Sequence, residues 1–161
     1  MNDDMADTPA GSAGTGDEEV GGLDEAATAA AMRVLDSAEC WARLASTSLG
    51  RLAFVVAGEV EIFPINYVVD GSAIVFRTGE GTKLAGLALA GPVAFEIDGY
   101  DEQSGLAWSV IAKGQAHRLD RSEELDHADA LDLRPWLPSL KPYFVRLEHL
   151  SVTGRAFPYR S

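Results

Sequence analysis

Two short glycine turns between runs of β-branched and aromatic residues constrain this chain most strongly. Gly58-Glu59 separates RLAFVVA from EVEIFPINYVV, and Asp70-Gly71 separates that second run from SAIVFRT. Such runs favour strands, and a short glycine-containing turn joins neighbouring strands into an antiparallel hairpin. The sequence therefore predicts three consecutive antiparallel strands with little chain between them.

Three further strands and a few short helices are expected along the rest of the chain. The strands are PVAFEID, LAWSVIAKGQAHRL and YFVRLEHLSVTGRAF. In the last of them, Phe144, Arg146 and Glu148 alternate with Val145, Leu147 and His149, as on the two faces of a strand. Helices are expected over residues 37–46, over TKLAGLALAG and from Ser122, where acidic residues follow at once. Six mostly antiparallel strands in one small domain indicate a closed or nearly closed barrel. The expected class is mainly β, within α+β, and any ligand should bind outside so small a barrel or between subunits.

The composition favours an ordinary globular domain and argues against several classes of partner. The chain has 161 residues, of which 47% are hydrophobic, and a formal net charge of −12. That length suits one domain, and that charge opposes nucleic-acid binding. No apolar run is long enough to cross a bilayer, and the acidic N-terminus does not resemble a secretory signal. We therefore expect no nucleic-acid partner, no membrane anchor and a cytoplasmic location.

The distribution of charge divides the chain into two parts. Much of the negative excess falls in the first 25 residues, among Gly, Ser, Thr and Ala. Residues 1–27 are therefore expected to form a disordered acidic leader, and residues 28–161 the barrel domain. The single cysteine, Cys40, excludes an internal disulfide and is expected to fill space beside Trp41.

The segment FRTGEGTKLAGL, residues 76–87, interrupts a strand with glycines and a lysine before an expected helix. The glycines let backbone amides approach an anion, while Thr82 can cap the helix and Lys83 adds a charge at its positive end. Arg77 offers a guanidinium fork suited to phosphate oxygens. The spacing of nucleotide-triphosphate and dinucleotide loops is absent. From local chemistry alone, both a monophosphate cradle and a simple turn stay open.

The order of segments resembles the pyridoxamine 5'-phosphate oxidase-like family of flavin-binding split barrels. The resemblance rests on GRLAF, PINY, FRTGEGTKLAGL, VAFEID, WSVIAKGQA and a closing TGR, and it covers residues 35–157. It implies a six-stranded antiparallel split β-barrel with short flanking helices, which forms a homodimer and binds FMN between its subunits. It also implies an FMN-dependent oxidoreductase that acts on an unidentified small molecule. The alternative is a protein that binds or senses flavin, deazaflavin or haem without turnover.

The same resemblance nominates cofactor contacts. The segment matching FRTGEGTK would hold the phosphate and ribityl chain, the strand with FPINY would lie against the flavin ring, and the strand with WSV would approach the flavin, often across the dimer. The candidate residues are Pro64, Ile65, Asn66, Arg77, Thr78, Thr82, Lys83, Trp108 and Ser109. Without the resemblance, Pro64 to Asn66 could be an ordinary edge strand and Trp108 a core residue. Arg155, in TGR, could neutralise phosphate or lie on the surface.

Two departures from the family argue against particular substrates. The chain ends in TGRAFPYRS and lacks the arginine- and histidine-bearing C-terminal segment with which the true oxidase grips its vitamin B6 substrate. The related nitroimidazole-resistance proteins usually carry a histidine where this chain has Arg77. Oxidation of vitamin B6 and reduction of nitroimidazoles are both disfavoured.

No catalytic side chain or metal site is indicated by the sequence. The three histidines, His117, His127 and His149, fall in separate segments with neither HxxxH spacing nor a Ser-His-Asp pattern. Glu96 and Asp98 alternate on one strand face, which alone does not indicate hydrolysis. A flavin carries its own redox chemistry, so the absence of an assigned catalytic residue agrees with the implied function.

Overall fold

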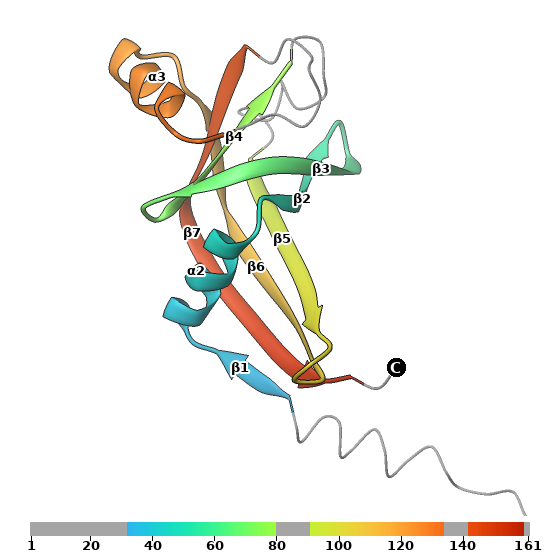
Figure 1. Cartoon of the computed structure of the whole chain (residues 1–161). Helices are drawn as coiled ribbons and strands as arrows, with labels where there is room; N and C mark the ends of the chain where they lie inside the picture. Colours follow the sequence, from blue (N-terminus) through green and yellow to red (C-terminus); the bar gives the residue numbers. More distant parts are fainter. Residues whose placement is uncertain (1–31, 80–90, 134–141, 160–161) are drawn as a thin grey trace, which may run out of the picture.

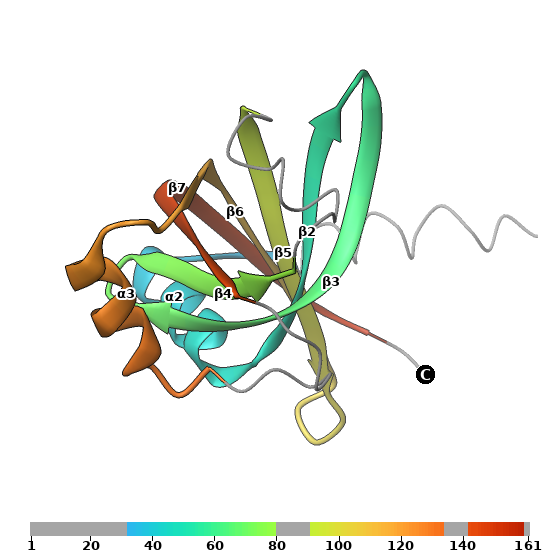
Figure 2. The same ribbon diagram turned by 90° about the horizontal axis from the view of Figure 1, so that it is seen from above.

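The computed structural model describes residues 32–79, 91–133 and 142–159 and places them in one ring of antiparallel strands with two helices packed against it (Figures 1 and 2). The expected leader over residues 1–27 and the helix expected over TKLAGLALAG lie outside the described residues. Among the helices of the described ranges, none has the length and apolar character that crossing a membrane would require.

The predicted strands and the two predicted helices inside the described ranges are confirmed. The elements are β1 (Arg33–Leu35), α2 (Ser37–Ser46), β2 (Leu49–Val56), β3 (Glu59–Asp70), β4 (Ala73–Thr78), β5 (Pro92–Asp101), β6 (Leu106–Arg118), α3 (Ser122–Asp129) and β7 (Tyr143–Pro158). The six expected strands are β2 to β7. The short strand β1 is an addition that the sequence did not indicate, because it follows a run of good helix formers.

The ring closes because β7 pairs with both ends of the strand order. The order is β1-β7-β4-β3-β2-β5-β6, and β6 pairs with β7 as well. One edge of β7 is occupied by β6 along most of its length. The other edge pairs with β4 over residues 143–147 and with β1 over residues 154–156. The barrel is therefore split where β7 passes from β4 to β1 (Figure 1).

The interior of the barrel is filled by side chains. Phe95 is completely buried, and its ring meets the edge of the Tyr67 ring at a centroid distance of 4.8 Å. Gly50 faces this ring so closely that an added Cβ would lie 2.2 Å from Phe95 Cζ. The core therefore leaves the outside of the barrel as the place for a ligand, as a barrel of six strands requires.

Each helix covers a different part of the barrel. Asp36 caps α2 through a reciprocal pair of bonds, since its Oδ1 accepts from Glu39 N at 2.8 Å and Glu39 Oε2 accepts from Asp36 N at 2.9 Å. The helix buries Cys40 completely, and burial raises the pKa of this thiol, which confirms a packing residue. Helix α3 covers a smaller apolar cluster on the outer side of β4 and β7, which includes Val75 and Phe144.

Candidate functional site

The strand residues of the predicted phosphate segment lie at the end of β4. The guanidinium carbon of Arg77 lies over the Phe144 ring, 4.6 Å from its centroid, in a cation–π contact. Thr78 is only 2% exposed. Thr82 and Lys83 lie outside the described residues. The structure thus positions Arg77 directly before the GEGTK segment and turns the side chain of Thr78 inward.

The predicted ring-contacting residues of β3 begin beside Arg77. Tyr67 pairs with Phe76, and Asn66 and Arg77 are the next residues along the two strands. Both belong to the outer face, because Tyr67 and Phe76 fill the core. Pro64 is exposed on the same face, whereas Ile65 is buried. The structure therefore places Pro64, Asn66 and Arg77 on the same outer face of the barrel, with Asn66 and Arg77 each one residue beyond the Tyr67–Phe76 pair.

Trp108 and Ser109 lie elsewhere on the barrel. The ring of Trp108 packs against the core, and an added Cβ on its partner Gly99 would lie 2.6 Å from Trp108 Cζ2. The guanidinium carbon of Arg43 lies over the indole, 4.5 Å from the ring centroid. Ser109 lies on the outer face of β6, opposite Asp98. The described geometry agrees with the interpretation of Trp108 as a core residue.

Ser109 and Arg155 do not join the group around Arg77 within one subunit. The strand order puts β2 and β5 between β3 and β6, so Ser109 is three strand spacings from Pro64, roughly 14 Å at about 4.8 Å per strand. Arg155 pairs with Ser109 and is exposed. Within one subunit, Ser109 and Arg155 therefore lie apart from the residues around Arg77.

A charged cluster that sequence analysis did not assign fills the outer face between these two groups. Arg51 Nη1 lies 3.0 Å from Glu96 Oε2 and also binds the Asp98 carboxylate. Bonding to Asp98 and then to Glu96 raises the pKa of Arg51. The alternation of Glu96 and Asp98 was visible in the sequence. The arginine that binds them could not be identified from the sequence, because Arg51 lies on another strand, 45 residues before Glu96.

The same outer face also exposes large apolar side chains. Ile62, on β3, is 62% exposed and precedes Pro64 by two residues, so both side chains lie on the same face. Cross-strand pairing puts the others on this face too: Leu49, Val55, Val60 and Ile111. These apolar side chains therefore share the outer face with the charged cluster of Arg51, Glu96 and Asp98.

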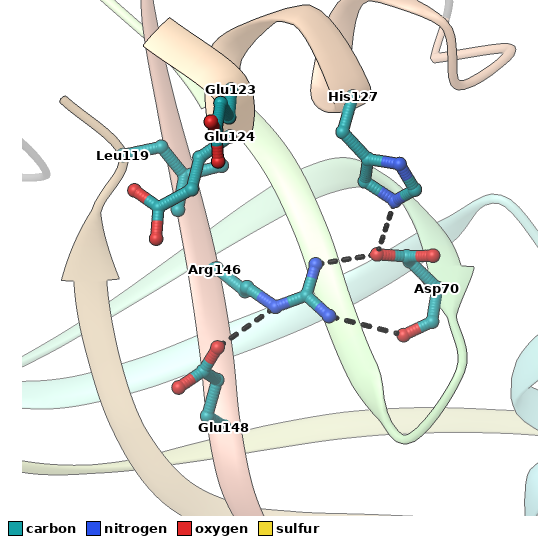
Figure 3. A pocket seen from close by; sticks show the side chains of 7 residues that line it. All are labelled: Asp70, Leu119, Glu123, Glu124, His127, Arg146 and Glu148. Carbon is teal, nitrogen blue, oxygen red and sulfur yellow. Dashed lines mark hydrogen bonds and ion pairs between the residues drawn. The ribbon is translucent and has the colours of Figure 1, made fainter. Parts of the chain in front are cut away.

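A hollow of about 270 Å³ lies on the far side of the barrel, between α3 and β7 (Figure 3). Its lining consists of Asp70, Leu119, Glu123, Glu124, His127, Arg146 and Glu148. Arg146 extends between two carboxylates, binding Asp70 and placing its Nε 2.8 Å from Glu148 Oε1. Among the residues that the structure describes, no predicted cofactor contact lines this hollow. No sequence motif marks it, because the barrel brings its residues together from four segments.

The Asp70–Arg146 ion pair in this hollow is expected to make the free energy of unfolding depend on pH. The Arg146 guanidinium, helped by His127, holds the pKa of Asp70 below its usual range. Because the pKa of Asp70 is lower in the folded chain than its unfolded value of about 3.9, the ionised carboxylate stabilises the fold above that pH. This contribution is lost as the pH falls through the pKa of the folded state. We expect the stability gap between the wild type and Asp70→Asn to narrow below about pH 4. Denaturant unfolding across this range measures it, and a gap independent of pH would contradict the assignment.

Comparison with known proteins identifies relatives of this chain by sequence and by fold. A family model described as pyridoxamine 5'-phosphate oxidase matches residues 36–156. A candidate pyridoxamine 5'-phosphate oxidase from Corynebacterium glutamicum is 39% identical with a TM-score of 0.73, over 81% of this chain and 96% of that one. A protein from Mycobacterium smegmatis described as FAD-binding is 38% identical with a TM-score of 0.67, over 78% and 98% of the two chains. An uncharacterised Mycobacterium tuberculosis protein is 37% identical over 57% of this chain and 82% of its own.

Proposed function

Since the chain belongs to the pyridoxamine 5'-phosphate oxidase family, we propose that it binds a flavin and acts as a flavin-dependent oxidoreductase on a small molecule. The observation that carries the proposal is the position of Arg77 on the outer face at the end of β4, stacked on Phe144 and directly before GEGTK. A guanidinium held in place by an aromatic ring loses little freedom on binding phosphate, which suits it to this task.

The proposal assigns a part to each predicted residue. Arg77 and Lys83 would neutralise the phosphate, with the hydroxyl of Thr82 and the amides of the glycine segment as donors. Thr78 would contribute through its backbone, because its side chain is buried. The β3 segment from Pro64 to Asn66 would border the flavin ring. The bound flavin supplies the hydride and electron transfer, so these residues need only bind and orient it.

A second copy of the chain would complete the site. The exposed apolar side chains around Ile62 need a cover, and the face that bears them also carries Pro64 at one side and Ser109 at the other. A homodimer formed through this face would shield the apolar surface and bring Ser109 of one subunit towards Arg77 of its partner. We propose this arrangement, in the cytoplasm, as the functional form.

FMN is the first cofactor candidate and FAD the second. The residue types around GEGTK predict a monophosphate cradle, which favours FMN. The description of the Mycobacterium smegmatis relative as FAD-binding favours FAD. Both share the flavin ring, ribityl chain and first phosphate, so the proposed contacts of Arg77 and Asn66 serve either.

Electron transfer separates an enzyme from a storage or sensing protein. We would load the protein with flavin, remove oxygen, add NADPH or NADH, and follow the loss of the flavin absorbance near 450 nm, the usual flavin maximum. The proposal predicts reduction of the bound flavin and its reoxidation by an added acceptor such as a quinone. Bound flavin that neither nicotinamide reduces would favour binding without turnover.

A further inference from the structure

Two of the three histidines meet a glutamate on the outer face of β6 and β7. One possible ligand atom from each of His117, Glu148 and His149 lies within 4.8 Å of the others. We propose that these residues form a binding site for a first-row divalent cation, with Zn²⁺ as the reference ion. The site is separate from the proposed flavin site and does not depend on it.

A β-bulge creates this arrangement. Glu148 and His149 are consecutive, so in a regular strand their side chains would point to opposite faces. Lys113 pairs with Ser151 but Gln115 pairs with Glu148, which leaves one extra residue on β7. His149 adopts a φ of 54°, which few residues other than glycine adopt. The bulge turns His149 back towards His117, and bulges commonly re-aim side chains in this way.

Gly114, opposite the bulge, fits this distortion. A Cβ at this position would lie 2.3 Å from the carbonyl oxygen of Glu148, which is a backbone atom and cannot rotate away. Only glycine lets the two strands approach so closely. The bulge that joins the ligands is therefore supported from the neighbouring strand as well as by the conformation of His149 itself.

The chemistry of the set suits zinc. Two imidazoles and a carboxylate are a common set of three protein ligands for Zn²⁺, with water in the remaining position. His117 Nε2 already lies 2.8 Å from Glu148 Oε2, where a cation would take the place of the proton between them. The side chains of His117 and Glu148 are 44% and 35% exposed, so an ion can reach them from solvent. His149 is exposed, and its ligand atom lies within 4.8 Å of those of His117 and Glu148.

The surrounding charges favour a cation. Arg146 binds the second oxygen of Glu148 at 2.8 Å and so orients the carboxylate, as outer-shell partners of metal ligands do. Its positive charge is matched by Asp70, to which it also binds. Glu123 and Glu124 line the adjoining hollow and make the region acidic.

His127 supplies a matched control. It lies near the same hollow, but its Nε2 is 3.0 Å from Asp70 Oδ2 and it is not one of the three clustered ligands. The chain contains three histidines in all, so substitution of each in turn tests every imidazole.

The experiment is a Zn²⁺ titration of the untagged full chain against a chromophoric chelator, at about pH 7.5 because bound ligands must be deprotonated. We expect one ion per chain, with His117→Gln and His149→Asn each weakening affinity by about tenfold or more. Asparagine tolerates the positive φ, so the second variant should fold. His127→Gln should bind as the wild type does. In parallel, Co²⁺ should give visible absorption bands that both ligand variants lose.

Two outcomes would overturn the proposal. The first is zinc affinity that neither His117→Gln nor His149→Asn changes, which would assign binding to carboxylates elsewhere. The second is the absence of binding at up to about millimolar zinc, the weakest range of specific protein–ion sites. Circular dichroism of each variant checks that a lost site is not a lost fold.

Discussion

Phe95→Ala is expected to lower the free energy of unfolding by about 3 to 5 kcal/mol, the range for deleting a fully buried aromatic ring. Phe95 has no exposed surface, contacts the edge of the Tyr67 ring, and packs against the bare backbone of Gly50. Since three strands close around this side chain, little of the resulting cavity can collapse. Urea unfolding followed by tryptophan fluorescence measures the change.

The matched control is Val34→Ala, which removes an apolar side chain that is 75% exposed on β1. Exposed substitutions of this kind usually change stability by no more than about 0.5 kcal/mol. A cost for Phe95→Ala as small as that of Val34→Ala would mean that the barrel does not close around Phe95.

Arg77→Ala is expected to weaken flavin binding by about 1.5 to 3 kcal/mol, or roughly tenfold to 150-fold, the loss of a hydrogen bond to a charged group. Lys83→Ala should weaken binding by a similar amount if both side chains reach the phosphate. Arg77→Lys should fall between the wild type and Arg77→Ala, since lysine keeps the charge but not the planar fork. Fluorescence quenching of free flavin on binding reports the affinity.

Arg33→Ala is the control for Arg77→Ala. It removes the same charge from an arginine that binds Glu39 at 2.7 Å, close to α2 and away from β4. Equal weakening in both variants would assign the effect to net charge. Unchanged affinity in Arg77→Ala would remove the arginine from the phosphate site.

Local elements of this fold could be predicted because their signals are local. The helix over residues 37–46 begins where predicted, and the turns after β2 and β3 fall at the glycine signals. The short strand β1 could not be predicted, since it exists only through pairing with Gly154 to Ala156 near the other end of the chain. Closure of the ring was expected from the number of strands in one small domain, but the pairing of β7 with β4, β6 and β1 that closes it is long-range and has no local signal.

The two candidate sites differ in the same way in how much of each could be predicted from the sequence. Arg77 was a candidate from local chemistry and from the resemblance, whereas Pro64 and Asn66 were nominated by the resemblance alone; the structure places all three on the outer face. The cluster of His117 with Glu148 and His149 had no signal in the sequence. It depends on a bulge in β7 opposite Gly114, and the preferences of neighbouring residues do not reveal a shift of register between two strands far apart in the sequence.

Titration of the untagged, flavin-free protein with FMN tests the central claim most directly, with FAD, the deazaflavin coenzyme and haem in parallel. The account predicts tight binding of one flavin per subunit, and a flavin spectrum on the protein as first isolated. Failure of both FMN and FAD to bind, whichever other ligand did, would keep the barrel and contradict the function. In that case GEGTK would be a turn.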